Sequence, residues 1–326
     1  MALVYQVRRR CQSGPMDGRK RRIREGDLVM AAVGRPKVIG ILGMGHMGSG
    51  VAADLKGSGF DVVTTLEGRS ARTKARAEAA GARLLPGLAA VLAAADTFLS
   101  IVPADQAEPL AAEVAASLDG KPLHFVDCNS ITPRRTERVR QMVEAAGAVF
   151  SDGGIIGPPP GPGKVLTRFY VSGPDCAVLE ALQSPQMAMR RLGDSKTQAT
   201  EMKILFAGIN KGTVALHNNV LAAAEKVGLR QAIMAEFDDM RPGLMRGVRG
   251  HAPELTDKAG RWAIEMLDVA DALEGLGAHG GYHRAAAEGY TRLDAALKAK
   301  GMPAGKSSAD DALARVLEAW LEDPGL

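Results

Sequence analysis

The chain has few aromatic side chains, few cysteines and no long uncharged apolar run. Aromatic residues make up 4% of its 326 residues, so a core must be built mainly from Ala, Val, Leu, Ile and Met. Three cysteines without pairing or metal-ligand spacing fit a reducing compartment, and we expect a cytoplasmic protein. The most apolar stretch, residues 88–103, is interrupted by Asp96, which argues against a membrane span.

Positive charge is concentrated at the N-terminus. Residues 1–37 contain 10 basic and 3 acidic residues, whereas the rest of the chain contains 31 basic and 34 acidic residues. The pI near 9.0 is therefore a property of the first segment, and we expect no nucleic-acid partner for the body. Residues 1–35 lack the apolar segment of a secretory signal, and we interpret them as a basic, disordered extension. An Arg-rich transit peptide, a nucleic-acid arm and a natural start at Met30 stay open as alternatives.

Strand-like and helical stretches alternate from residue 37 to about residue 195, which predicts a parallel-rich sheet with crossover helices. The expected strands are residues 38–42, 61–65, 97–102, 124–127, 149–152, 168–172 and 189–192. The expected helices between them are residues 47–58, 70–80, 88–95, 104–118, 133–146 and 174–183. Beyond residue 198 strand signals vanish, and we expect helices at residues 198–227, 230–240, 256–276, 284–300 and 308–322.

The helix expected at residues 198–227 is the longest of these. Its apolar side chains Leu205, Ile209, Leu216 and Val220 recur at helical spacing, which predicts one packed face. We therefore divide the chain into the extension at 1–35, an α/β domain at 36–195 and an all-helical domain at 196–326.

A glycine-rich motif lies directly between the first expected strand and the first expected helix. It comprises Gly43, Met44, Gly45, His46, Met47 and Gly48. The first glycine permits a tight turn, the second lets the backbone approach a pyrophosphate, and the third lets helix and strand pack closely. The helix N-terminus offers unpaired N–H groups to the phosphates. The motif in this context predicts a dinucleotide-binding (Rossmann) fold for the α/β domain.

The residues after the second expected strand bear on the choice of cofactor. Glu67 favours NAD, because an acidic side chain there binds the ribose diol. Arg69, Ser70 and Arg72 favour NADP, because guanidinium and hydroxyl donors suit its additional phosphate. We expect NADP, with NAD as the alternative.

Residues 43–59 read GMGHMGSGVAADLKGSG and resemble the GxGxMGxxMAxNLxxxG opening of the β-hydroxyacid dehydrogenases. That family includes 3-hydroxyisobutyrate, tartronate semialdehyde and 6-phosphogluconate dehydrogenases. Asp54 stands where the family usually has Asn. The resemblance covers about residues 37–300, and the segments around Arg261-Trp262, Glu265-Met266 and residues 283–287 are similar to a branch with a 6-phosphogluconate-dehydrogenase-like C-terminal domain. It implies a homodimer, whereas the substrates of that branch are not uniform.

Two segments of the α/β domain resemble the family's nicotinamide and substrate turns. Residues 100–103 (SIVP) resemble the turn after the fourth strand, which implies that Val102 and Pro103 lie near the nicotinamide. Residues 127–133 (DCNSITP) resemble the D-x-S-T-I-x-P segment, which implies that Asn129 and Ser130 contact the substrate or the nicotinamide.

Two further segments resemble the family's substrate strand and catalytic helix. Residues 152–157 (DGGIIG) are similar to the DAPVSG segment, which implies substrate contacts by Gly154 and Ile155. Ile156 stands where a carboxylate-binding Ser is common. The long helix places Lys203 at the family's catalytic lysine, although Ala207 replaces the usual Asn four residues later.

Lys203 has neighbours that suit a general base. Oxidising an alcohol needs a hydride acceptor and a base, and a lysine acts as a base only if its pKa is lowered, for example by burial. Apolar residues flank Lys203 in sequence and can desolvate it. Asn210 and His217 share its helical stripe; we expect Asn210 to contact the substrate and His217 to pack. Lys211, beside the stripe, is a candidate for binding an anionic substrate group.

These observations predict an NADP-dependent oxidoreductase that interconverts a hydroxyl and a carbonyl group on a small carboxylate-bearing substrate. An imine reductase of the same architecture is an alternative, although its lysine position typically carries another residue. A non-catalytic NADP-binding protein is a second alternative, because of the departures at Ile156 and Ala207. His279 and His283 lack neighbouring carboxylates, so we expect no metal. The loop at residues 157–163 is either a cover over the substrate or a rigid connector.

Overall fold

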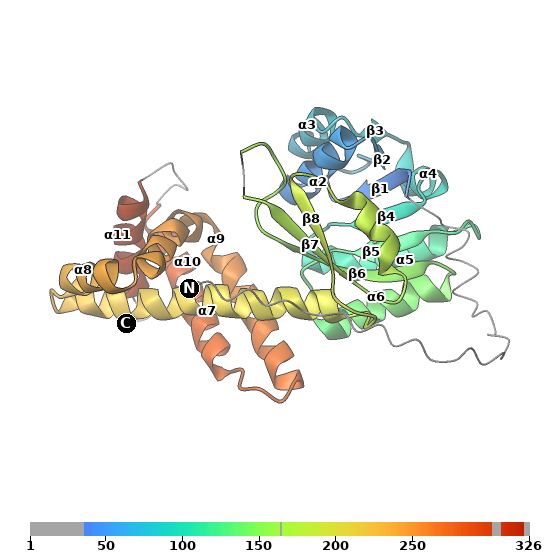
Figure 1. The fold of residues 1–326 in the computed structure, drawn as a ribbon. Helices are drawn as coiled ribbons and strands as arrows, with labels where there is room; N and C mark the ends of the chain where they lie inside the picture. The colour runs from blue at the N-terminus through green and yellow to red at the C-terminus, as the bar shows by residue number, and fades with distance from the viewer. Residues whose placement is uncertain (1–35, 164, 302–307, 323–326) are drawn as a thin grey trace, which may run out of the picture.

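The computed structural model describes residues 36–163, 165–301 and 308–322. The basic segment 1–35 therefore lies outside the described residues. An eight-stranded sheet forms the first part, in the order β3-β2-β1-β4-β5-β6-β7-β8. Its neighbouring strands are parallel except for the antiparallel pair β6–β7. Helices α8 to α11 gather at the other end of the molecule, and α7 runs between the two parts (Figure 1). The predicted α/β fold followed by an all-helical part is confirmed.

Most elements begin and end within a few residues of the predicted bounds. The strands are β1 (Val38–Leu42), β2 (Asp61–Thr64), β3 (Arg83–Leu84), β4 (Thr97–Ser100), β5 (His124–Asp127), β6 (Val149–Ile156), β7 (Thr167–Ser172) and β8 (Met187–Arg191). The helices of the α/β part are α2 (His46–Gly57), α3 (Ala71–Ala79), α4 (Gly87–Ala94), α5 (Ala107–Ser117) and α6 (Pro133–Ala145), with short 3-10 turns η1 (Ala104–Gln106) and η2 (Cys176–Leu182). The later helices are α7 (Gln198–Lys226), α8 (Arg230–Met240), α9 (Pro242–Gly275), α10 (Gly281–Ala299) and α11 (Ala309–Trp320).

Helices cover both faces of the sheet. Helices α2 and α3, with η2, pack on one apolar face, and α4, α5 and α6 pack on the other. The central strands are buried on both sides and are therefore almost continuously apolar. Phe98, Phe125 and Phe150 stack across β4, β5 and β6 with ring centroids 5.6 and 6.4 Å apart. These three rings form one stacked row in the core between the sheet and helices α4 to α6.

Four elements differ from the prediction. The helix expected at residues 174–183 is the 3-10 turn η2. Strand β3 was not expected, because its two residues are exposed and carry no apolar signal. The strand expected to end at residue 152 continues to Ile156, because Gly153 and Gly154 pair with β7. Helix α9 begins at Pro242 rather than at residue 256, with Pro253 inside it.

The predicted packed face of α7 is wrong for the single chain. Ile209 is 76% exposed and Leu216 is 61% exposed, and Leu205 and Val220 are also exposed. The buried face consists of residues such as Ile204, Gly208, Ala215 and Ala222. Small residues dominate this face because other helices approach α7 closely there: a Cβ on Gly208 would lie 3.0 Å from a methyl group of Val269 on α9, and one on Gly212 would lie 3.1 Å from the His283 ring on α10.

Three aromatic residues hold the helical part together. Tyr290 on α10 contacts Trp262 on α9 and Trp320 on α11 edge-on, each with ring centroids 5.5 Å apart. The Tyr290 hydroxyl donates a hydrogen bond of 2.7 Å to the carbonyl oxygen of Lys211 on α7. These contacts tie four helices to one cluster.

None of the helices described here is long and apolar enough to cross a membrane.

Candidate active site

The glycine-rich turn between β1 and α2 has the steric features expected of it. Gly43 has φ +101°, and a Cβ there would lie 2.0 Å from the carbonyl oxygen of Ile101. A Cβ on Gly48 would lie 2.1 Å from the carbonyl oxygen of Gly43. Around Gly45, by contrast, a Cβ would meet no heavy atom within 4 Å, and no side chain caps the α2 N-terminus. The close packing at Gly43 and Gly48, and the open space beside Gly45 at the α2 N-terminus, fit a bound pyrophosphate.

The other residues of this turn have distinct surroundings. Met44 is buried, whereas His46 begins α2 and is exposed. Met47 packs partly against the core below α2. The predicted cofactor contacts of these three residues stay predictions.

The proline-rich loop at residues 157–163 packs on helix α2. A Cβ on Gly50, in α2, would lie 2.8 Å from Cβ of Pro159. The start of the loop is held to β7, where the Thr167 hydroxyl donates a hydrogen bond of 2.6 Å to the carbonyl oxygen of Pro158. The loop therefore lies beside the dinucleotide turn.

The predicted cofactor-selecting residues lie on the surface after β2. Ser70 caps α3 by accepting a hydrogen bond of 3.3 Å from the backbone N–H of Thr73. Arg69 and Arg72 are exposed and form no ion pair with any residue that the structure describes. Glu67 lines a surface depression beside them. Both guanidinium groups are thus available to an anion, and Glu67 is available to a ribose diol.

Asn129 joins the carboxyl ends of β4 and β5. Its Oδ1 accepts a hydrogen bond of 2.7 Å from the backbone N–H of Val102. Its Nδ2 donates to Ser100 Oγ at 2.8 Å and to the Asp127 carboxylate. Asn129 is buried, so these bonds fix the turn that carries Val102. Ser130 and Pro103 are exposed at the rim of this region, and their predicted ligand contacts stay predictions.

Two buried carboxyl groups lie below the start of α7. Asp127 and Asp152 are opposite each other in the β5–β6 register. Burial raises the pKa of Asp127 to about 7, and the neighbouring charge of Asp152 acts in the same direction. Burial raises the pKa of Asp152 to about 6, although hydrogen bonds from Thr200 oppose this effect.

Asp152 attaches the first turn of α7 to the sheet. Its carboxylate accepts two hydrogen bonds of 2.7 Å, from the backbone N–H and from the hydroxyl of Thr200. Ser172 on β7 accepts a hydrogen bond of 3.0 Å from the backbone N–H of Ala199. These acceptors satisfy N–H groups that lack partners within the helix. Asp152 therefore acts as a remote cap that fixes the α7 N-terminus.

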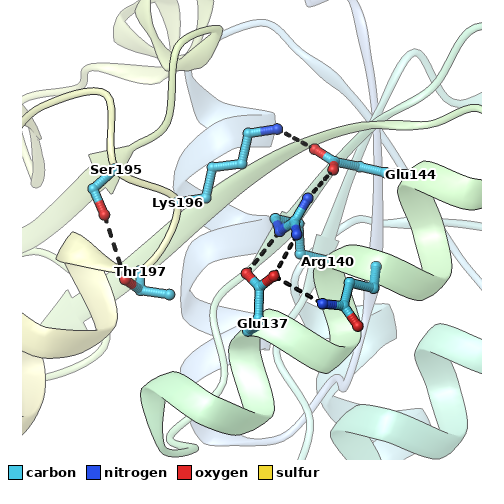
Figure 2. A network of polar contacts seen from close by, with 7 residues as sticks. Glu137, Arg140, Glu144, Ser195, Lys196 and Thr197 are labelled. Carbon is cyan, nitrogen blue, oxygen red and sulfur yellow. Dashed lines mark hydrogen bonds and ion pairs between the residues drawn. The ribbon is translucent and has the colours of Figure 1, made fainter.

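A surface network holds the segment before α7 to helix α6. Arg140 bridges Glu137 and Glu144 on α6, and Lys196 reaches Glu144 from the loop that leads into α7 (Figure 2). Together with the Asp152 cap, it attaches the start of α7 to the α/β part at two places.

Lys203 lies one turn beyond the Asp152 cap. Burial lowers the pKa of Lys203; nearby Cys128, Asp127 and Asp152 raise it, and Arg261 lowers it further. The Lys203 side chain forms no hydrogen bond or ion pair with any residue in the described ranges. A partly desolvated amine without a partner can hold or release a proton at Nζ.

Gly154 brings β6 into direct contact with α7. A Cβ on Gly154 would lie 2.5 Å from the carbonyl oxygen of Ala199 and 3.6 Å from Cβ of Lys203. Ile155 and Ile156 are both buried, so this strand end offers no side-chain donor to a substrate. The structure therefore gives Gly154 a packing role beside Lys203; substrate contacts by Gly154 and Ile155 stay predictions.

The candidates further along α7 separate into two groups. Asn210 is partly exposed and forms no hydrogen bond with a described side chain, so its amide is available. Lys211 instead forms an ion pair with Glu265 and lies 5.2 Å above the ring of Trp262. His217 is partly buried, and burial lowers its pKa. The described residues contain no group of three or more His, Cys, Asp or Glu side chains that could hold a metal ion.

Comparison with known proteins identifies the class of each part. Residues 38–184 match the NAD binding domain of 6-phosphogluconate dehydrogenase, and residues 224–293 match a domain of unknown function, DUF1932. The chain therefore joins an NAD-binding domain of the 6-phosphogluconate dehydrogenase type to a DUF1932 domain. The expected resemblance to the 6-phosphogluconate dehydrogenase type is confirmed for the NAD-binding domain.

Solved structures share the fold over most of the chain. A conserved hypothetical protein from Sinorhizobium meliloti 1021 is 24% identical, with 87% of this chain and 96% of that chain covered and a TM-score of 0.67. A 3-hydroxyisobutyrate dehydrogenase from Mycobacterium tuberculosis is 18% identical (85% and 98% covered, TM-score 0.65). Psf3 in complex with NADP+ and 2-OPP is also 18% identical (85% and 99% covered, TM-score 0.61). A search of the curated proteins gives no match.

Sequence reasoning missed two features of this region. Asp127 is the last residue of β5, and Asp152 lies opposite it within β6. Both residues end strands expected from the sequence, at residues 124–127 and 149–152, and this shared position was a usable signal, because parallel strands end at the same edge of a sheet. Arg261 lies in another helix, 58 positions from Lys203, and no spacing in the sequence relates the two residues.

Proposed function

We propose that the protein is an NADP-dependent oxidoreductase that interconverts a hydroxyl and a carbonyl group on a small carboxylate-bearing substrate. The observation that carries this proposal is the Lys203 amine, which is desolvated, unpaired among the described residues and set at the edge of a dinucleotide-binding sheet. The small-molecule substrate would lie near Lys203, Asn210 and the turn held by Asn129.

When bound, the nicotinamide supplies the hydride acceptor or donor. Lys203 supplies the proton chemistry: neutral Nζ accepts the hydroxyl proton in oxidation, and the ammonium returns it in reduction. Burial lowers the pKa of Lys203 and so favours the neutral amine, whereas the charges of Asp127 and Asp152 raise this pKa and favour the ammonium. The balance between these effects sets the pH at which each direction runs.

The preference for NADP rests on Arg69, Ser70 and Arg72. The two exposed guanidinium groups and the hydroxyl at the α3 N-terminus suit a phosphate on the ribose. Glu67 beside them supports the alternative, NAD. Initial rates with each cofactor decide between the two.

Replacing Lys203 tests the proposed function. We expect Lys203→Ala to lose about 10²- to 10⁴-fold in turnover, which is the usual contribution of a general acid or base. Turnover is followed by the absorbance of the reduced nicotinamide on a panel of hydroxy acids and sugar acids. Lys226→Ala, an exposed position at the other end of α7, is the matched control.

The outcomes separate the alternatives. Unchanged turnover with normal cofactor binding would remove Lys203 from the mechanism. NADP binding by the wild type without turnover of any panel member would favour the non-catalytic alternative, whereas reduction of cyclic imines in place of carbonyl compounds would favour an imine reductase. Lys203 argues against an imine reductase, because imine reductases typically carry another residue at this position.

The exposed apolar face of α7 supports a homodimer. Leu205, Ile209, Leu216 and Val220 form a stripe that nothing in the described part of the chain covers. Contiguous exposed apolar side chains of this kind mark association surfaces. We propose that a second copy covers them. A cytoplasmic location stays a prediction.

A further inference from the structure

One face of the β6–β7 pair carries both α7 and an unpaired arginine. In the antiparallel register, Gly154 lies opposite Tyr170 and Ile156 lies opposite Arg168. Side chains alternate between the two faces of a strand, so these four positions share one face. This face meets α7, because a Cβ on Gly154 would lie 3.6 Å from Cβ of Lys203. Arg168 therefore extends from the face of the sheet on which Lys203 lies.

Spacing within the sheet places Arg168 close to the proposed base. Neighbouring strands lie about 4.8 Å apart, and a strand rises about 3.3 Å per residue. The Cα atoms of Arg168 and Gly154, one strand and two positions apart, are thus separated by about 8 Å. Tyr170 lies between them and packs with Ala199 of α7, with Met202 against both. Figure 1 shows the start of α7 beside β6 and β7, which it contacts.

A second arginine, on β8, faces the same way. In the parallel β7–β8 register, Arg190 lies opposite Tyr170 and Ala188 lies opposite Arg168. The Arg190 guanidinium carbon lies 5.9 Å from the centroid of the Tyr170 ring, a cation–π contact that keeps it over this face. The Cα atoms of the two arginines are about 8 Å apart by the same strand spacing. Both guanidinium groups can therefore reach one ligand.

No carboxylate in the described ranges pairs with either arginine. Arg168 is half-buried and Arg190 is exposed, and neither side chain forms an ion pair or hydrogen bond with a described residue. Arg191, the next residue of β8, points to the opposite face and does have a partner, Asp194, at 2.9 Å. The two arginines that share a face with α7 are thus the ones that lack a counter-ion.

Three acidic groups of this region do not neutralise the arginines. Asp152 is on the same face, but four residues of β6, about 13 Å, separate it from the level of Arg168. Asp127 belongs to β5, two strands away from β7. Glu201 on α7 accepts a hydrogen bond of 2.9 Å from the Thr197 hydroxyl. The guanidinium donors therefore remain available to a ligand.

We propose that Arg168 and Arg190, with the Tyr170 hydroxyl, bind a phosphate or phosphonate group of the substrate beside Lys203. This inference rests on the proposed function and adds a tetrahedral dianion to its substrate. The dianion occupies one end of a molecule whose hydroxyl carbon reaches Lys203.

The number of charges and donors favours a tetrahedral dianion over a carboxylate. Each guanidinium group carries one positive charge and five N–H donors. A carboxylate offers two oxygens and one negative charge, whereas a phosphate monoester offers three oxygens and a charge of about −2. The Tyr170 hydroxyl has no hydrogen-bond partner in the described part of the chain and can donate to the third oxygen. Two arginines and one phenol thus match three oxygens.

Binding of three small anions tests this subsite without turnover. Propylphosphonate and ethyl phosphate carry the dianion on chains of equal length, and butyrate carries a carboxylate on the same propyl chain. Dissociation constants are measured by saturation-transfer difference NMR on the full-length protein. Saturating NADP fills the proposed phosphate site at Arg69 and Arg72. We expect both dianions to bind at least about tenfold more tightly than butyrate, and the tighter of the two identifies a phosphonate or a phosphate ester.

Replacing each arginine tests the assignment. We expect Arg168→Gln and Arg190→Gln each to weaken propylphosphonate at least about tenfold, because a charged hydrogen-bond donor is lost. Arg168→Lys should give an intermediate affinity, because it keeps the charge and loses the planar fork. Arg191→Gln is the matched control, since it removes the same charge from the opposite face, and should bind like the wild type. Arg190 is exposed, so Arg190→Gln keeps the test decisive if Arg168→Gln unfolds.

Four results would overturn the assignment: wild-type binding of neither dianion, butyrate binding as tight as that of propylphosphonate, unchanged affinity in folded Arg168→Gln or Arg190→Gln, or an equal loss in Arg191→Gln. Because this assay needs no chemistry, it is independent of the Lys203→Ala test. Loss of turnover in Lys203→Ala with unchanged phosphonate binding in both glutamine variants would reject the subsite alone. Weakened binding in those variants with unchanged turnover in Lys203→Ala would reject Lys203 as the base alone.

Discussion

A methyl group added at Gly154 should displace the proposed base mainly by pushing on the α7 backbone one turn before it. The added Cβ would lie 2.5 Å from the carbonyl oxygen of Ala199, whereas an ordinary contact begins near 3.4 Å. Strand β6 and helix α7 must therefore separate by roughly 1 Å, since both atoms belong to packed backbone. Overpacking of this size costs about 1–3 kcal/mol of unfolding free energy, and a misplacement of about 1 Å can cost about 10²-fold in rate.

Steady-state kinetics and thermal unfolding of Gly154→Ala measure both effects. We expect kcat to fall by about 10²-fold and Tm to decrease. Gly247→Ala in α9 is the matched control, because no heavy atom lies within 4 Å of its added Cβ; it should be neutral or slightly stabilising. A wild-type kcat in Gly154→Ala would refute the idea that this contact places Lys203. A raised KM with unchanged kcat would instead indicate that Gly154 touches the substrate.

Three further changes test other parts of the site. Oxidation needs neutral Lys203, so its rate rises with pH through the Lys203 pKa; Asp127→Asn removes a charge that raises this pKa and should move the rise to lower pH, whereas Arg261→Gln should move it to higher pH. Shifts of the same sign in profiles of log kcat/KM against pH would contradict this assignment. Arg72→Gln should raise KM for NADP by about tenfold and leave KM for NAD little changed, as measured by initial rates; equal changes would show that Arg72 does not contact the phosphate. Ile209→Glu should convert a dimer to monomers in sedimentation velocity, and an unchanged sedimentation coefficient would place the dimer interface elsewhere.

The α/β part could be predicted from sequence because local signals and tertiary packing agree there. Strand β1 spans residues 38–42 as expected, since a β-branched run ends at a glycine that needs φ +101°. The close contacts expected of Gly43 and Gly48 are present for the same reason. Helix α9 was harder: Pro253 indicated a break, but the helix continues through it from Pro242, with packing on both sides of the proline.

The arrangement of the helical part could not be predicted, because it depends on which neighbour each face meets. The apolar stripe containing Ile209 has the periodicity of a buried face, yet α9 and α10 pack on the opposite side, where Gly208 and Gly212 leave room for His283. Periodicity reports that a face is apolar and does not report whether the same chain or another one covers it. The proximity of Arg261 to Lys203 similarly depends on how α9 crosses α7.

The attachment of α7 by Asp152 has a mechanical consequence. The helix continues without a break for 29 residues and is bonded to the sheet at Thr200, so a rigid-body swing of α7 would pivot there. At a rise of about 1.5 Å per residue, Lys203 lies about 5 Å from this pivot and Lys226 about 39 Å from it. A swing of about 10° would carry the far end roughly 7 Å and Lys203 less than about 1 Å. Such a swing would leave the proposed base nearly stationary and would move the helices packed against the far end of α7.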